Sequence, residues 1–154
     1  ALAVTTCTQE VQDAFISDDK MKTFFHGHSY TGNPIACAAA CANLDLFENS
    51  STWDAIGRIE EKHRGFLEKA KNWDGILNPR QLGTILALEI ETPENTSYFN
   101  NRRDHIYNHF MDRGIVLRPL GNEIYVVPPY CITEEELDQV YSEILDYASE
   151  FGVN

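Results

Sequence analysis

Residues 24–34 read FFHGHSYTGNP and lead directly into the run IACAAACANLDLF at residues 35–47. The first stretch combines two histidines and two glycines with serine, tyrosine, threonine and asparagine, a composition typical of a loop at a functional site. Asn33 can accept hydrogen bonds from the first free amides of a helix, and Pro34 supplies a preset φ at the first helical position. The sequence therefore predicts a site loop that feeds a helix beginning at Pro34.

This loop has the residues to hold an anion. Gly27 and Gly32 permit a close approach of the backbone to a ligand, and Ser29 and Thr31 offer hydroxyl groups beside backbone amides. An ordinary connection rich in glycine, asparagine and proline would have the same composition. On residue chemistry alone both interpretations remain open.

Hydrophobic periodicity and turn residues predict the remaining elements. The Thr133 and Glu136 pair forms the S/T-x-x-E capping box of a last helix. Gly114 is placed to end the preceding helix with a left-handed residue. Strands clustered among helices, with a hairpin, indicate an α+β fold with a mainly antiparallel sheet. The expected elements are a β-like stretch at 1–6, helices at 8–16, 34–47, 52–72 and 98–113, strands at 76–77 and 84–91, and a hairpin of strands 115–118 and 123–127 joined by the turn 119–122.

Composition excludes several classes of function. The 154 residues are 43% hydrophobic, enough for a compact core, and carry a formal net charge of −12. Such an acidic chain argues against binding to nucleic acid or to an anionic membrane surface. No apolar run approaches the length of a membrane span, so the cytoplasm is the expected location.

Cysteine and histidine spacing gives no metal motif. Cys7, Cys37, Cys41 and Cys131 lack the C-x-x-C pattern and are expected to be free thiols of a reducing compartment. His105 and His109 stand four apart, but a structural zinc site needs four ligands, and no third or fourth ligand occurs at motif spacing. We therefore expect no metal.

Four blocks in the chain resemble the class III aminotransferases, which depend on pyridoxal phosphate. The blocks occur in the expected order and cover essentially the whole chain. Within the class, the Arg-Pro-Leu-Gly block with Tyr125 and the following PPY is most similar to the aminotransferases of biotin synthesis. The blocks are ALAVTTCTQEVQDAF at 1–15, HGHSYTGNPIACAAA at 26–40, RQLGTILALEIE at 80–91 and GIVLRPLGNEIYVVPPYCIT at 114–133.

The resemblance implies a division of the chain into two parts. Residues 1–49 would be a remnant of the large α/β cofactor-binding domain, including the site loop and the interdomain helix. Residues 50–154 would be the small carboxy-terminal domain of a fold-type I pyridoxal-phosphate-dependent transferase. The first part, without the rest of its sheet, would leave sheet-edge groups and apolar surface uncovered, and we expect it to associate, to reorganise or to be poorly ordered. Dimerisation or proteolytic nicking before Pro34 would reveal this.

Site residues follow from the same resemblance. Ser29 matches a threonine whose hydroxyl and amide bind the cofactor phosphate of the partner subunit, and His28 also faces that phosphate. Gly27 matches a main-chain contact to substrate. Arg118 matches the arginine that clamps a substrate carboxylate, and Tyr125 would lie beside the same pocket. Without the resemblance, Arg118 would be interpreted as a solvated hairpin residue and Tyr125 as a packing residue.

The implied reaction is the transfer of an amino group from S-adenosylmethionine to 8-amino-7-oxononanoate, which gives 7,8-diaminononanoate in a homodimeric enzyme. The lysine that forms the Schiff base lies upstream of ALAVTT in the family, so we expect this chain alone to be inactive. Its own five lysines stand in polar contexts. Two alternatives remain: a class III aminotransferase acting on ornithine or an ω-amino acid, and a non-catalytic interaction module.

Overall fold

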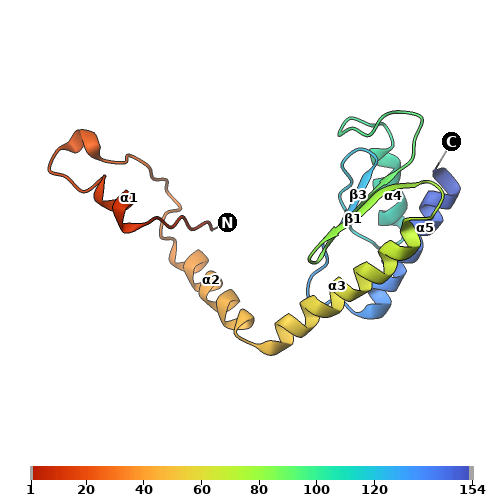
Figure 1. Ribbon diagram of the computed structural model, residues 1–154, viewed down its shortest axis with the longest axis horizontal. Coiled ribbons are helices and arrows are strands. Elements are labelled where there is room, and N and C mark those ends of the chain that lie inside the picture. Colours follow the sequence, from red (N-terminus) through yellow and green to blue (C-terminus); the bar gives the residue numbers. More distant parts are fainter. Residues whose placement is uncertain (1, 153–154) are drawn as a thin grey trace. The chain divides into compact units, whose positions relative to one another are not determined.

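The computed structural model describes residues 2–152 and divides into two compact units, the first ending at Asn49 and the second beginning at Ser50 (Figure 1). The first unit contains the short helix α1 (Gln9–Asp13), one 3-10 turn (Lys20–Lys22) and helix α2 (Pro34–Phe47). The side chain of Thr8 caps α1 by accepting a hydrogen bond from the amide of Val11.

Helix α2 begins where the sequence predicts. The Oδ1 atom of Asn33 accepts hydrogen bonds from the amides of Ile35 at 3.0 Å and Ala36 at 3.2 Å. Pro34 occupies the first helical position, where a missing N–H costs nothing. The predicted start at Pro34 and end at Phe47 are both confirmed.

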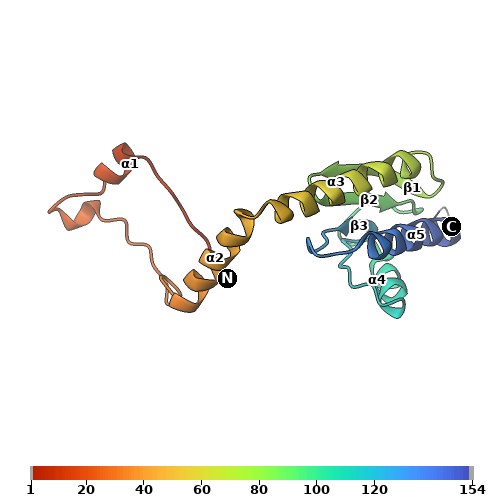
Figure 2. The same ribbon diagram turned by 90° about the horizontal axis from the view of Figure 1, so that it is seen from below.

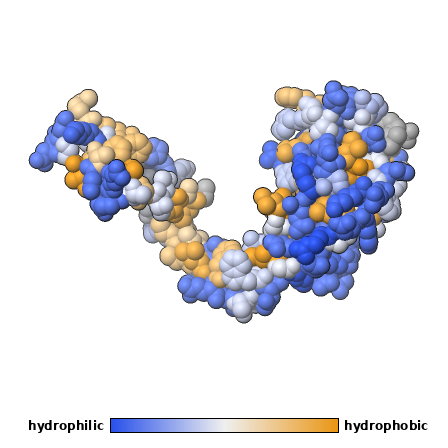
Figure 3. Space-filling model, viewed as in Figure 1, coloured by the Kyte–Doolittle hydropathy of each residue, from blue (hydrophilic) through white to orange (hydrophobic). Residues whose placement is uncertain are grey.

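The first unit has no core of its own. None of residues 2–49 is buried, and Figure 3 shows hydrophobic residues on the face of this unit that is in view. Because folding free energy comes mainly from burying apolar surface, this segment gains little stability from its own contacts. Its most exposed apolar side chains are Val4, Met21, Phe25, Tyr30 and Ile35.

Limited proteolysis should reveal this difference between the units. The only trypsin sites in residues 2–49 are Lys20 and Lys22, both exposed. Because nothing buries the backbone around them, we expect trypsin to cut here before it cuts at any site in residues 50–152. Mass spectrometry of the first fragments checks this order. First cleavage at Arg58 or Lys62 would contradict it.

The second unit is an α+β domain, as predicted. It consists of α3 (Ser50–Ala70), β1 (Ile76–Leu82), β2 (Ile85–Ile90), α4 (Arg103–Asp112), β3 (Glu123–Val126) and α5 (Glu134–Phe151). The three strands form one antiparallel sheet in the order β1-β2-β3. In Figures 1 and 2, α3 and α5 run alongside this sheet and α4 lies next to α5.

Alternation along the strands gives the sheet one buried face and one open face. Leu86, Leu88 and Ile90 of β2 are buried, whereas the intervening Ala87 and Glu89 are partly exposed. The buried face packs with residues from all three helices, and this cluster is the hydrophobic core. The helical members include Ile59 and Phe66 from α3, Ile106 and Phe110 from α4, and Leu137, Ile144 and Tyr147 from α5.

Two helix ends follow local rules. After α4, the amide of Ile115 donates to the carbonyl of Phe110 at 2.9 Å and the amide of Gly114 donates to that of Met111 at 3.0 Å, which is the Schellman pattern. Gly114 has a φ of +74°, as predicted for this position. At the start of α5, Thr133 and Glu136 form the predicted capping box.

The predicted hairpin of residues 115–118 with 123–127 is wrong. Residues 115–118 form no strand, and β3 pairs with β2 instead. The isolated bridge between Leu120 and Glu123 lies in the turn and involves no residue of 115–118. Pro119 lacks an amide donor for a ladder, and the amide of Ile115 is already bound to the end of α4.

Other boundaries also differ from the expectation. Strand β1 runs to Leu82 rather than ending at residue 77, because a register shift between Leu77 and Arg80 accommodates Asn78 at a φ of 49°. Helix α4 begins at Arg103 rather than at residue 98, because the preceding Asn100 side chain accepts from the amide of Arg102 at 2.9 Å. Residues 2–6 form no strand, and residue 1 lies outside the described residues.

A buried polar triad links α3, α5 and the start of β2. The Nε2 atom of His63 lies 3.1 Å from the carbonyl oxygen of Thr84, and its Nδ1 atom lies 2.6 Å from the hydroxyl of Tyr141. Because a carbonyl can only accept, Nε2 carries the proton and Nδ1 accepts from the tyrosine hydroxyl. Burial lowers the pKa of His63 below its usual 6.5, although the bond to Thr84 acts in the opposite direction. The folded chain therefore holds His63 neutral.

Stability should decrease in mild acid because of this histidine. The pKa of His63 is lower in the folded than in the unfolded chain, so protons bind the unfolded chain preferentially once the pH falls below about 6.5. We expect the free energy of unfolding, measured by urea denaturation, to be lower at pH 5.5 than at pH 7.5. His63→Gln should reduce this difference, leaving the contribution of His109, whose pKa burial also lowers. An unchanged difference would contradict the assignment.

Candidate functional site

Arg118 lies on an extended segment between α4 and a tight turn. The segment leaves α4 at Gly114, and within residues 2–152 the amides of Val116, Leu117 and Arg118 have no hydrogen-bond partner. Ile115 and Leu117 pack against the hydrophobic core, while Val116 and Arg118 are exposed. This alternation keeps the arginine side chain away from the core.

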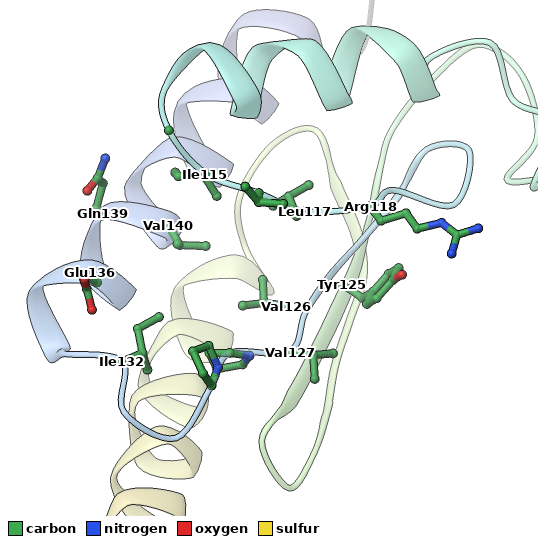
Figure 4. A pocket seen from close by; sticks show the side chains of 14 residues that line it. Ile115, Leu117, Arg118, Tyr125, Val126, Val127, Ile132, Glu136, Gln139 and Val140 are labelled. Atoms are coloured by element: carbon green, nitrogen blue, oxygen red, sulfur yellow. The ribbon is translucent and has the colours of Figure 1, made fainter. Parts of the chain in front are cut away.

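The chain reverses at residues 120–123 and returns as β3. The amide of Leu120 donates to the carbonyl of Glu123 at 2.9 Å, and the amide of Glu123 donates to the carbonyl of Leu120 at 3.1 Å. Tyr125 then pairs with Ala87 of β2 and is partly exposed on the open face of the sheet. Figure 4 shows the side chains of Arg118 and Tyr125 next to each other and directed the same way.

A pocket of about 410 Å³ adjoins this pair. Its walls are mostly apolar and come from the segment after α4, from β3 with the prolines that follow, and from α5. Figure 4 places Arg118 and Tyr125 at one end, with Glu136 and Gln139 of α5 on the opposite side. The apolar walls include Ile115, Leu117, Val126, Ile132 and Val140.

The guanidinium of Arg118 is free to bind a ligand. Within residues 2–152 it makes no ion pair or hydrogen bond. By contrast, Arg80 on the open face of the sheet is paired with Glu123 and lies 3.7 Å from Glu89. An unpaired guanidinium presents two parallel N–H groups that match a carboxylate. The structure thus brings together Arg118 and Tyr125, the two site residues predicted in the second unit.

The other three predicted residues lie in the loop before α2. The amide of Thr31 donates to the carbonyl of His28 at 3.0 Å, and the Nδ1 atom of His28 accepts from the amide of Tyr30 at 3.2 Å. The imidazole is therefore used within the loop. Among the described residues, the amide and hydroxyl of Ser29 have no partner, and the space around Gly27 is open.

These contacts identify the groups that could bind a phosphate. The side chain of Asn33 already accepts hydrogen bonds from the amides of Ile35 and Ala36. The amino-terminal end of α2 therefore has fewer free N–H donors for a phosphate than an uncapped helix would have. Ser29, with its hydroxyl and its backbone amide, has the donors that a phosphate oxygen needs. The loop fits a phosphate-bearing cofactor through Ser29 more directly than through the side chain of His28.

None of the five lysines is placed to bind a cofactor carbonyl. Lys62 pairs with Asp138 at 2.5 Å and Lys71 pairs with Glu68 at 2.7 Å. The other three, Lys20, Lys22 and Lys69, are exposed. Catalytic lysines are usually desolvated or beside another cation, so these side chains do not have the required setting.

The two histidines of α4 each contact a side chain of α5. The Nδ1 atom of His105 lies 2.8 Å from the hydroxyl of Tyr147, and the Nε2 atom of His109 lies 3.7 Å from Glu143. Among residues 2–152, no three or more histidine, cysteine, aspartate or glutamate side chains gather as a metal site would require. In the same part of the chain, no helix combines the length and apolar character needed to cross a bilayer.

Sequence reasoning missed the residues that support this site from other elements. Glu136 and Gln139 line the pocket from α5, and Asn122 is buried beneath the turn between Arg118 and Tyr125. The signal for Asn122 was present in the Leu-Gly-Asn turn, but a turn asparagine is usually exposed. Only the tertiary structure shows which partners surround it.

Comparison with known proteins identifies the family. The model of the aminotransferase class III family matches residues 1–147. The chain therefore belongs to the class III aminotransferases, which are pyridoxal-phosphate-dependent enzymes.

Among its relatives are enzymes named adenosylmethionine-8-amino-7-oxononanoate aminotransferase. That of Synechococcus elongatus is 36% identical over 149 residues, which cover 97% of this chain and 34% of the relative. That of Geobacter sulfurreducens is 40% identical over 145 residues, covering 89% of this chain and 31% of the relative. The crystal structure of the Methanocaldococcus jannaschii enzyme superposes with a TM-score of 0.82 at 28% identity, covering 93% of this chain and 34% of that one. The chain thus spans about a third of the length of these relatives.

Proposed function

We propose that this chain is part of an enzyme that transfers the amino group of S-adenosylmethionine to 8-amino-7-oxononanoate, giving 7,8-diaminononanoate in biotin synthesis. The observation that carries the proposal is the unpaired guanidinium of Arg118 beside Tyr125, in a chain up to 40% identical to enzymes of that name. A carboxylate substrate with an aliphatic chain requires a cation next to apolar walls. The pocket has apolar walls, and at one end of it the guanidinium of Arg118 is directed outward next to Tyr125 (Figure 4).

Arg118 and Tyr125 would orient the substrate. The guanidinium binds the substrate carboxylate through two N–H groups, and the neighbouring tyrosine contributes its ring and hydroxyl at the same end. A carboxylate fixed in this way sets the distance from the reacting carbon atom to the catalytic centre, which lowers the entropic part of the barrier. The same pair would recognise any amino donor or acceptor with a carboxylate at that distance.

The loop of the first unit would hold the cofactor. Ser29 donates its hydroxyl and amide to the phosphate of pyridoxal phosphate bound mainly by the partner subunit of a homodimer, with His28 beside it and Gly27 facing substrate through its backbone. The cofactor, when bound, serves as the electron sink of the amino transfer. The unused hydrogen-bonding capacity of Ser29 supports this role.

The division of the chain fits the same scheme. The unit ending at Asn49 corresponds to part of the large cofactor-binding domain, and the unit from Ser50 to the small carboxy-terminal domain. The lysine that binds the cofactor covalently would come from outside these residues. The complete enzyme would work in the cytoplasm, a reducing compartment in which the four free cysteines of this chain stay unpaired. We expect the 154-residue chain alone to be inactive.

The test is a product assay on the complete protein. Purified with pyridoxal phosphate, it should form 7,8-diaminononanoate from S-adenosylmethionine and 8-amino-7-oxononanoate, as detected by mass spectrometry. Ornithine and an ω-amino acid serve as competing donors in parallel reactions. Faster amino transfer from either of these would assign the protein to another class III activity, and no transfer from any donor would favour a non-catalytic module.

A further inference from the structure

Backbone hydrogen bonds hold the segment that carries Arg118 only at its ends, while Leu117 packs against the hydrophobic core. Residues 116–119 make no backbone hydrogen bond to any residue that the structure describes. On one side the segment is tied to α4 through the amide of Ile115, and on the other it enters the turn at Leu120. The position of Arg118 relative to Tyr125 therefore depends on the packing of Leu117 and on how firmly this turn is held.

Asn122 attaches the turn to the rest of the domain. Its side chain is buried, with 1% of its surface exposed. The Nδ2 atom donates to the carbonyl of Ile90 at 2.8 Å and to Oγ1 of Thr96 at 3.1 Å, and Oδ1 accepts from the amide of Ser97 at 3.4 Å. The main-chain carbonyl of Asn122 also accepts from the amide of Ile90 at 2.9 Å.

These bonds join three parts of the chain at one point. The side-chain amide connects the turn to the end of β2 and to the loop that follows it, and its three polar contacts use both donors and the acceptor. Thr96 continues the network, because its hydroxyl donates to Glu89 at 2.7 Å. Glu89 lies on the same open face as Tyr125. Because the buried Asn122 amide has a partner for both donors and for its oxygen, these contacts favour one geometry of the turn.

We propose that Asn122 is a positioning residue for substrate binding, which holds the turn so that Arg118 and Tyr125 stay side by side. This inference rests on the proposed function, in which Arg118 binds the substrate carboxylate. Asn122 does not touch substrate and acts through Arg118. Its effect should therefore appear only for substrates that use the guanidinium.

A double-mutant cycle in the complete protein tests the coupling. Asn122→Ala, Arg118→Ala and the double variant are assayed with 8-amino-7-oxononanoate and with the same amino ketone carrying a methyl group in place of the carboxylate. We expect Asn122→Ala to reduce kcat/KM for the carboxylate substrate about fivefold to tenfold when Arg118 is present, and less than about twofold when Arg118 is absent. The substrate without the carboxylate should show the smaller effect in both backgrounds.

A second pair of variants protects the test against misfolding. Thr96→Val removes one hydrogen-bond partner of Asn122, whereas Thr96→Ser keeps the hydroxyl. The serine variant should retain the parental kcat/KM. The valine variant should have a lower kcat/KM for the carboxylate substrate, and only when Arg118 is present. Equal losses with and without Arg118, or for both substrates, would overturn the positioning role and leave a structural one. If Arg118→Ala itself failed to distinguish the two substrates, the carboxylate clamp of the proposed function would be wrong, and the inference would fall with it.

Discussion

Replacement of Arg118 by alanine in the complete protein is expected to lower kcat/KM for 8-amino-7-oxononanoate by roughly 10- to 100-fold, the equivalent of losing a charge-assisted pair of hydrogen bonds. The guanidinium makes no ion pair or hydrogen bond within the described residues, so its removal breaks no internal polar contact. The loss should therefore come from binding rather than from unfolding. Arg118→Lys should recover only part of it, because an ammonium group cannot bind both carboxylate oxygens in one plane.

Arg64→Ala is the matched control for this prediction. Arg64 is an exposed arginine on α3 that pairs with Glu61, far along the chain from the pocket residues. Its loss should leave kcat/KM unchanged, since exposed pairs of this kind contribute little. Steady-state kinetics with both variants separate a specific effect from a loss of one positive charge. Similar kcat/KM values for the two variants would refute the clamp.

Replacement of Gly121 by alanine should destabilise the second unit by more than about 3 kcal/mol. A Cβ atom at this position would lie 1.8 Å from the carbonyl oxygen of Ser97 and 2.9 Å from its carbonyl carbon. Both atoms belong to the backbone, so the clash cannot be relieved by a rotamer change. Gly121 also has a φ of +64°, which an L-residue adopts at a cost.

Gly114→Ala isolates the contribution of the backbone angle. Gly114 has a φ of +74°, but no atom lies within 4 Å of a Cβ placed there. This variant should lose only about 1–2 kcal/mol. Urea denaturation followed by tryptophan fluorescence measures both, because Trp53 and Trp73 are the only tryptophans and both lie in the second unit. Equal losses for the two variants would show that the turn can move away from Ser97.

Local rules predicted much of this fold. The start of α2 followed from Asn33 and Pro34, the end of α4 from Gly114, and the start of α5 from Thr133 with Glu136. Each of these features depends on residues within one helical turn, so the sequence contains the whole interaction. A strand at residues 84–91 was likewise predicted from its apolar pattern, and β2 occupies Ile85–Ile90.

The errors arose where distant residues decide the outcome. Residues 115–118 have a pattern typical of a strand, but pairing depends on which edge is free, and β3 pairs with β2. Asn78 and Pro79 resemble strand breakers, yet the register shift after Leu77 carries β1 past them. Helix α4 begins late because Asn100 is held by Thr92 and Asn95, which lie five or more residues away.

The candidate site divides in the same way. Arg118 and Tyr125 were identified through a resemblance of motifs, and the structure adds that they are neighbours and that Arg118 is unpaired. Asn122 could not be identified, because its side-chain contacts are with Ile90, Thr96 and Ser97 in another part of the chain. Arg118 and Tyr125 belong to a motif that can be recognised in the sequence, whereas the contacts of Asn122 are visible only in the folded chain.

The most direct test of the account is a crystal structure of the complete protein with pyridoxal phosphate and 8-amino-7-oxononanoate. We predict that both oxygens of the substrate carboxylate are bound by the guanidinium of Arg118, with Tyr125 in contact, and that Ser29 contacts the cofactor phosphate. A carboxylate bound by other residues, with Arg118 still exposed to solvent, would contradict the account.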